Sequence, residues 1–174
     1  MNVRTADSFT SLRGRSFGRT LEIMVRATNP SLKALEVLAG RWEMVIRWSP
    51  KTHELVGGPA SVRGDAHFDW IEDGRALVLR QGGNGAPQAS WVIGRDEASD
   101  GYCVLYADSR GISRIYEMSF ADGVWRIWRN AAGFGQRFEG RVSVDGRTID
   151  GWWEKSTDGR SWQRDFDLTY VKAS

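Results

Sequence analysis

Cysteine and histidine are scarce in this sequence of 174 residues. The single cysteine, Cys103, cannot form an internal disulfide, so nothing points to an oxidising compartment. The two histidines, His53 and His67, do not combine with it in the spacing of a metal site. The sequence therefore predicts neither a disulfide framework nor a metal centre.

Long hydrophobic runs and a strong net charge are missing too. No apolar stretch approaches the roughly 18–20 residues that a membrane-spanning helix needs, and the N-terminus has no apolar core followed by a cleavage site. The formal net charge is only +2 and the arginines are scattered, which gives no support to nucleic-acid binding. We therefore expect a cytoplasmic protein that binds neither a membrane nor nucleic acid.

Familiar catalytic motifs are also lacking. The sequence has no Gly-x-Ser-x-Gly nucleophile elbow and no Gly-Lys-Ser/Thr phosphate-binding loop. The glycine-rich run 82–85 joins two predicted strands without a helix behind it, so we interpret it as a hairpin loop. Catalysis by enclosure and hydrogen-bond polarisation needs no nucleophile, so these absences do not exclude an enzyme.

What the sequence has in quantity is periodic apolar patterning. Leu32, Leu35 and Leu38 recur at helical spacing and predict a short helix that begins at Pro30 and ends before Gly40. Such a helix is marginal alone, so we expect its leucine face to dock on the end of a barrel. From Gly40 onward the period changes to the alternation of a strand.

Turn residues divide the rest of the chain into strands. Asp-Gly pairs, which favour tight hairpins, begin at Asp73, Asp100, Asp122, Asp145 and Asp158. Between the turn signals the predicted strands are 40–48, 62–72, 75–81, 88–95, 102–108, 112–120, 123–130, 135–144, 147–155 and 161–171. About ten hairpin-linked strands predict an all-β, antiparallel up-and-down barrel, because closure removes both exposed edges. A two-sheet sandwich is the alternative.

The chain length suits one domain, which we expect to be a barrel over residues 28–174. Residues 1–27 are rich in Ser, Thr and Arg and show no clear period, so they are interpreted as a poorly ordered tail. A basic arm or a targeting segment is the alternative. Met24 is a second candidate for the true start.

The Gly40-x-Trp42 sequence after a short helix resembles the first-strand signature of the calycins, the superfamily of lipocalins, fatty-acid-binding proteins and nitrobindin-like barrels. Together with the runs 108–118, 133–140 and 162–170, it resembles a mostly actinobacterial lipocalin-like family of unknown function. The resemblance covers about 30–172 and implies a ten-stranded barrel with an internal cavity. It implies no agreed activity.

The superfamily resemblance implies roles for two kinds of residue, the cation beside the signature tryptophan and the haem-binding histidine. In lipocalins the signature tryptophan stacks against a cation from the last strand, and Lys172 rather than Arg164 is the candidate here, since the first and last strands lie side by side. Nitrobindins bind haem through a histidine near their C-terminal strands, whereas this sequence has none after His67. His67 has the opposite parity to Phe68 and should face outward. We expect no cofactor.

Polar residues on otherwise apolar strand faces are the candidate ligand contacts. Parity places Arg114 and Tyr116 inside the barrel with Met118, and it places Gln136 with Phe138. It also places Arg164 inside, with Trp162 and Phe166. A buried, unpaired arginine is costly, so each needs a carboxylate, a water-filled cavity or a bound anion.

Structural roles for the two arginines are the alternative. Their heads would then lie in water at the barrel mouth, or pair with Glu117, Asp108 or Glu154. The face of strand 102–108 depends on the next loop: a three-residue loop places Tyr106 opposite Arg114, whereas a two-residue loop brings Cys103 and Leu105 inside instead.

The sequence thus predicts a barrel that binds a small hydrophobic or aromatic molecule, with a carboxylate or another acceptor. The candidate ligand-binding residues are Arg114, Tyr116, Tyr106, Gln136, Arg164, Trp91, Phe138 and Trp162. A cavity enzyme of the cyclase or isomerase type is the first alternative, and it would require an acid within reach of the ligand beside Arg114. A dimerising module that works through its outer face is the second.

The lack of a late histidine generates a prediction about haem. The purified protein incubated with hemin should show no sharp Soret band of ligated iron in its absorption spectrum. A Soret band that disappears in His67→Ala would contradict the outward placement of His67. The nitrobindin comparison would then be the better guide.

Overall fold

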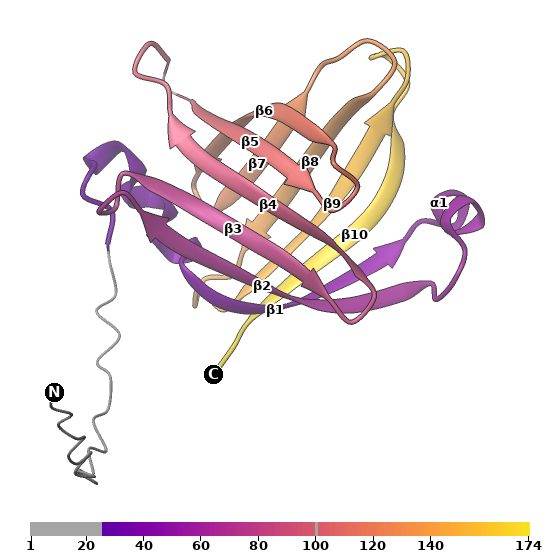
Figure 1. The fold of residues 1–174 in the computed structure, drawn as a ribbon, viewed down its shortest axis with the longest axis horizontal. Coiled ribbons are helices and arrows are strands. Elements are labelled where there is room, and N and C mark those ends of the chain that lie inside the picture. Colours follow the sequence, from indigo (N-terminus) through magenta and orange to yellow (C-terminus); the bar gives the residue numbers. More distant parts are fainter. Residues whose placement is uncertain (1–25, 100) are drawn as a thin grey trace, which may run out of the picture.

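The computed structural model describes residues 26–99 and 101–174. Its strands form one closed antiparallel barrel in which each strand pairs with its neighbours in sequence and β1 closes on β10 (Figure 1). The strands are β1 (Gly40–Trp48), β2 (Ser61–Ile71), β3 (Ala76–Gly83), β4 (Ala86–Arg95), β5 (Tyr102–Asp108), β6 (Ser113–Ala121), β7 (Val124–Arg129), β8 (Gly135–Val142), β9 (Thr148–Ser156) and β10 (Gln163–Lys172). The predicted up-and-down barrel is confirmed.

Strand boundaries follow the sequence pattern closely. The predicted strands 40–48 and 102–108 coincide with β1 and β5 at both ends. The other predicted boundaries lie within about two residues of the observed ones, which is the spread between assignment methods. Alternation with a period of two, the Asp-Gly pairs and the other glycine-containing turn signals are therefore sufficient to locate every strand.

The first helix, η1 (Pro30–Leu38), is a 3₁₀-helix that closes one end of the barrel. Its three leucines are fully buried, and Tyr102 Oη donates a hydrogen bond of 3.0 Å to the Ser31 carbonyl oxygen. Side chains three residues apart lie on one face of a 3₁₀-helix, so the strict spacing of Leu32, Leu35 and Leu38 suits it better than an α-helix. The predicted docking of the leucine face is observed.

A second helix, α1 (Pro50–Val56), was not expected from the sequence. Ser49 caps it, Pro50 stands at its first turn and Gly57 follows its end. Its seven residues are too few to display a helical period, so the segment looked like a loop. His53 lies on α1.

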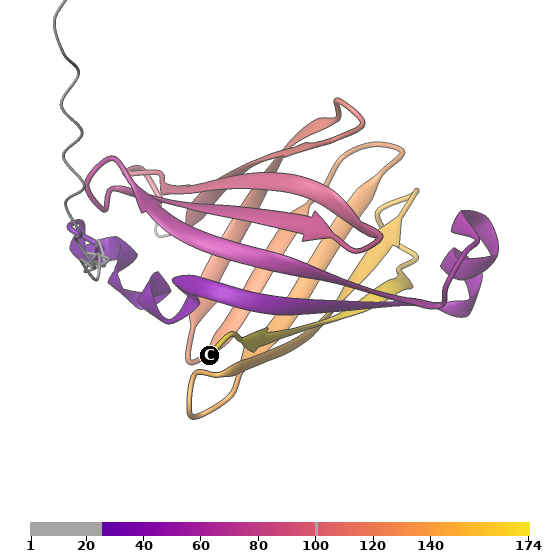
Figure 2. The same ribbon diagram turned by 60° about the horizontal axis from the view of Figure 1, so that its bottom comes forward.

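Helices η1 and α1 lie at opposite ends of the barrel (Figures 1 and 2). In an up-and-down barrel, alternate connections share one end. The β3–β4, β5–β6, β7–β8 and β9–β10 loops therefore lie with α1, and we call this end the mouth. Within the described ranges, no helix has the length and apolar character to cross a membrane.

Lys172 makes the cation contact expected for the signature tryptophan. Its Nζ lies 5.0 Å from the centroid of the Trp42 ring and donates a hydrogen bond of 3.2 Å to the Val37 carbonyl oxygen. Trp42 Nε1 donates one of 2.8 Å to the Leu38 carbonyl oxygen. Strands β1 and β10 are thus tied to the end of η1.

The chain entering η1 packs on the β2–β3 turn. Residues 1–25 of the expected tail lie outside the described residues, but Ala27 packs partly buried against the core. Thr28 N donates a hydrogen bond of 3.0 Å to the Gly74 carbonyl oxygen, and Thr28 Oγ1 donates one of 2.7 Å to that of Asp73. The packed part of the chain therefore reaches at least to Ala27.

Gly74 tests this packing. A Cβ atom there would lie 2.0 Å from the Arg26 carbonyl oxygen, and its φ is +81°. Gly159, with a φ of +70° and nothing within 4 Å, is the matched control. Both alanine variants pay the left-handed backbone penalty of about 1–2 kcal/mol, but only Gly74→Ala displaces residues 26–28.

Thermal unfolding should therefore show a larger loss for Gly74→Ala than for Gly159→Ala. A difference of about 1 kcal/mol corresponds to roughly 2–4 °C in a chain of this size. Equal losses would mean that the packing of residues 26–28 adds nothing to stability.

Candidate functional site

A cavity of about 510 Å³ occupies the barrel interior and reaches the mouth. Its wall is formed by residues of β1, of β3 to β10 and of α1, with Phe134 from the β7–β8 loop at the mouth. This volume falls within the range of about 300–1,000 Å³ that is typical of small-molecule sites. The leucines of η1 close the far end, so a ligand would enter past α1.

The cavity wall is rich in aromatic side chains that contact one another. Centroid distances are 4.6 Å from Trp91 to Tyr106 and 5.9 Å from Trp91 to Trp153. They are 5.3 Å from Trp153 to Phe138 and 5.1 Å from Phe138 to Trp125. These rings come from five strands and form a continuous surface suited to a planar or hydrophobic molecule.

Arg114 faces inward and lines the cavity, as parity predicted. Its guanidinium carbon lies 4.6 Å from the centroid of the Phe134 ring and 5.8 Å from that of Tyr106. No carboxylate in the described part of the chain lies within ion-pair distance of it. Aromatic faces, rather than a counterion, hold this cation.

The acids considered as partners of Arg114 are engaged elsewhere or point away. Asp108 pairs with Arg110 at 2.6 Å, and Glu154 pairs with Arg137 at 2.6 Å. Glu117 is exposed on the opposite face of β6. The alternative in which Arg114 serves a structural ion pair is therefore not supported.

Tyr116 and Gln136 form a hydrogen bond inside the cavity. Tyr116 Oη donates to Gln136 Oε1 at 2.5 Å, and both side chains are buried. Burial raises the pKa of Tyr116, and the nearby Arg114 charge opposes part of that rise. The hydroxyl therefore stays protonated at neutral pH, and the pair presents neutral polar atoms beside Arg114.

Tyr106 belongs to a second polar network, centred on Asp108. Asp108 Oδ2 accepts hydrogen bonds of 2.8 Å from Tyr106 Oη and 2.6 Å from Arg110 Nη2. Asp108 Oδ1 accepts bonds of 2.9 Å and 3.3 Å from the backbone N–H groups of Arg110 and Ile112. Arg110, joined by Tyr106 and these amides, holds the pKa of Asp108 well below its usual value. The carboxylate is thus a fixed acceptor at neutral pH.

The pairing of β5 with β6 shows how long the loop before β6 is. Tyr106 pairs with Arg114, and Val104 pairs with Tyr116 across the hairpin. Of the two loop lengths considered, this pairing matches the three-residue loop, and Cys103 and Leu105 are exposed.

Arg164 does not enter the cavity, contrary to the parity prediction. A β-bulge between Arg164 and Phe166 inserts one residue into β10, so the side chains before it change faces. Arg164 is exposed, with Nε 3.3 Å from Asp167 Oδ1 and its guanidinium carbon 4.8 Å from the Trp152 ring centroid. Asp165 takes the inward position and is buried.

Trp162, also predicted to form the wall, is displaced by the same irregularity. It does not line the cavity. Its ring lies 4.4 Å from the guanidinium carbon of Arg137, an exposed residue on the outer face of β8. Of the eight predicted site residues, the six that line the cavity are Arg114, Tyr116, Tyr106, Gln136, Trp91 and Phe138.

Three residues that the sequence did not single out form a polar cluster at the mouth. Asp165 Oδ1 accepts hydrogen bonds of 2.8 Å from Lys155 Nζ and 2.8 Å from Thr52 Oγ1, and Lys155 Nζ also donates to Thr52 Oγ1 at 3.0 Å. The cluster links β9, β10 and α1. Only Thr52, buried on a short helix that begins with a Ser-Pro signal, had a local sequence cue.

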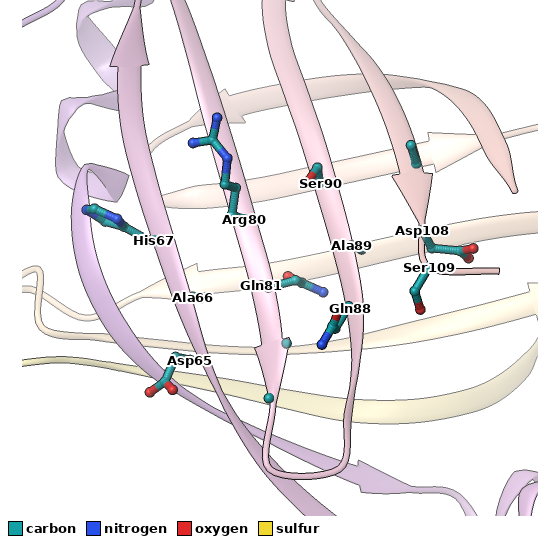
Figure 3. Close-up of a pocket in the computed structure, with 13 residues that line it drawn as sticks. Asp65, Ala66, His67, Arg80, Gln81, Gln88, Ala89, Ser90, Asp108 and Ser109 are labelled. Carbon is teal, nitrogen blue, oxygen red and sulfur yellow. The ribbon is translucent and has the colours of Figure 1, made fainter. Parts of the chain in front are cut away.

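A second hollow, of about 540 Å³, lies on the outer face of β2 to β5 (Figure 3). His67 faces outward there, as predicted, and its Nε2 lies 3.1 Å from Asp69 Oδ1. Arg80 Nη1 lies 3.6 Å from the other oxygen of Asp69. The hollow is lined by glycines, alanines, serines and polar or charged side chains, and no Phe, Tyr or Trp lines it. The interior cavity is therefore the better candidate site.

Comparison with known proteins supports the fold. No protein-family model matches the chain, and no curated protein is significantly similar to it. Among solved structures, the chain is similar to the crystal structure of Rv2717c from M. tuberculosis, with a TM-score of 0.60 and 15% sequence identity. The match covers 84% of this chain and 99% of that one.

Arg114 has no acidic partner in the described part of the chain, and this generates a stability prediction. Arg114→Met should leave the free energy of unfolding within about 1 kcal/mol of the wild type, because it orphans no carboxylate. Arg110→Met is the control: it removes the main partner of Asp108, whose side chain is 2% exposed. That variant should cost about 1–2 kcal/mol, a value reduced by the exposure of Arg110 itself.

Urea denaturation followed by tryptophan fluorescence measures both variants. A loss of about 3–5 kcal/mol in Arg114→Met is the signature of an orphaned buried acid. That result would contradict the placement of Arg114 as a cation without an acidic partner.

Proposed function

We propose that this protein is a calycin-like barrel that binds a small, largely apolar or aromatic molecule with an anionic or other acceptor group. The observation that carries the proposal is Arg114, a cation with no carboxylate partner among residues 26–99 and 101–174, in an aromatic cavity of about 510 Å³. In this partly buried position, an anion on the ligand would gain a charge-assisted hydrogen bond from the guanidinium. The Trp42–Lys172 contact and the closed ten-strand barrel support the calycin comparison.

The proposed contacts divide by chemistry. Arg114 binds the anionic group, and the hydrogen-bonded pair of Tyr116 and Gln136 lies beside it as a neutral polar surface. Tyr106 supports Arg114 through its ring face. Trp91 and Phe138 contribute apolar wall. Arg164 and Trp162 are left out, because neither lines the cavity.

The two carboxylates in the cavity wall already accept hydrogen bonds from the protein, which favours a binding protein over an enzyme that uses the cavity. Asp108 accepts hydrogen bonds from Tyr106, Arg110 and two backbone amides, which leaves it a poor proton acceptor. Asp165 is engaged by Lys155 and Thr52. A homodimer that works through the outer face stays a prediction, as does a cytoplasmic location; size-exclusion chromatography with light scattering tests the former.

A matched pair of fluorescent probes tests the proposal. The aromatic sulfonate 8-anilinonaphthalene-1-sulfonate differs from N-phenyl-1-naphthylamine only in its anionic group. We expect both probes to bind. Arg114→Met should lower the affinity for the sulfonate by about 10–150-fold, the equivalent of about 1.5–3 kcal/mol. The affinity for the neutral amine should change by less than about threefold.

Arg164→Met is the control variant, since it removes a guanidinium from outside the barrel. Arg164→Met should leave the affinities for both probes unchanged. Equal loss of the sulfonate in the two variants, or no loss in Arg114→Met, would contradict the proposal. Native mass spectrometry of the purified protein would then identify any molecule that co-purifies with it.

A further inference from the structure

The charged side chains around the mouth do not balance. Those that line the cavity are Asp108, Arg110, Arg114, Lys155 and Asp165. Each of the two acids already has a cation, since Arg110 Nη2 lies 2.6 Å from Asp108 Oδ2 and Lys155 Nζ lies 2.8 Å from Asp165 Oδ1. Arg114 therefore remains as a positive charge with no counterion among the described residues.

Arg129 is a second cation of this kind. It is the last residue of β7 and shares the inward face of Trp125 and Ile127, so it stands at the rim of the cavity, just beyond the residues of the wall. Its side chain is partly buried. Within residues 26–99 and 101–174, no carboxylate lies within ion-pair distance of its guanidinium. A partly buried guanidinium has five N–H donors and is costly to leave without an acceptor.

The two unpaired arginines lie around the same hydroxyl group, that of Tyr116. Glu117 pairs with Trp128, so Tyr116 and Arg129 are the next neighbours along β6 and β7 toward the mouth. Arg114 is two residues from Tyr116 on β6, which makes it a diagonal neighbour of Arg129. The Cβ atoms of such neighbours lie about 7–8 Å apart, within reach of long side chains. Burial raises the pKa of Tyr116, and the charges of both arginines oppose that rise.

We propose that Arg114 and Arg129 together bind a head group with two negative charges on one centre, as in an aryl phosphate monoester. This inference rests on the proposed function and narrows the anionic group of its ligand. Two cations this close repel each other, and a dianion between them balances both charges. One guanidinium can take both oxygens of a carboxylate, whereas a phosphate monoester has three terminal oxygens and can accept from two guanidinium groups.

1-Naphthyl phosphate and 1-naphthyl sulfate test the charge of the head group, because they share the ring, the ester oxygen and the tetrahedral shape. At pH 8 the phosphate is a dianion, since its second pKa is about 6, and the sulfate is a monoanion. Isothermal titration calorimetry of the full chain should show the phosphate binding about tenfold or more tightly than the sulfate.

Two variants assign the preference to residues. Arg129→Met should lower the affinity for the phosphate by about tenfold and that for the sulfate by less than about threefold. Arg114→Met should lower both affinities, because either head group contacts Arg114. Arg126→Met is the matched control: it removes a guanidinium from the outer face of the same strand, where Arg126 Nε lies 3.0 Å from Glu139 Oε2. It should leave both affinities unchanged.

The possible outcomes separate this inference from the proposed function. Equal affinity of the wild type for the two esters would overturn the inference and leave the proposed function standing. Binding of neither ester would overturn both. A preference for the phosphate that persists in Arg129→Met, or that disappears equally in Arg126→Met, would overturn the role of Arg129. The wild-type comparison decides even where a variant fails to fold.

Discussion

The pairing of the first strand with the last is the constraint on which the rest of the structure depends. Strands β1 and β10 pair from Trp42 opposite Lys172 to Trp48 opposite Phe166. Without this seam the sheet would expose two edges, and the cavity would open along its length. The Lys172 ammonium over the Trp42 ring, bonded also to the Val37 carbonyl oxygen, ties η1 to the seam. Closing the sheet therefore also closes one end of the barrel.

Closing one end gives the cavity a polar gradient. The charged groups of the wall, among them Arg110, Arg114 and Lys155, lie near the strand ends that surround the mouth. Toward η1 the wall consists of aromatic rings, among them Trp125 and Phe138. Charges stay where water can still reach them, because full burial of an unpaired ion is too costly. An amphipathic ligand would therefore enter with its anionic group trailing toward the mouth.

Sequence periodicity predicts most of this arrangement, because a closed sheet converts parity directly into inside and outside. The opposition of Tyr106 and Arg114 follows from strand parity and a three-residue loop, and the Trp42–Lys172 contact follows from the order of strands. Strand parity gives the wrong face where a β-bulge inserts an extra residue into a strand. The bulge between Arg164 and Phe166 has no glycine to announce it, and it turned a predicted inward arginine outward.

The bulge and the unpredicted helix belong to one feature of the mouth. By turning Asp165 inward, the bulge places a carboxylate where it accepts hydrogen bonds from Lys155 and from Thr52 on α1. Without the inserted residue, Arg164 would face Lys155 and repel it, and Thr52 would lose its acceptor. The irregularity in β10 thus adds a buried side-chain contact with α1, beside the hydrogen bond from Lys51 Nζ to Gln163 Oε1. A regular strand pattern could not reveal this, because the partner that Asp165 meets lies on another element, more than 100 residues away in the sequence.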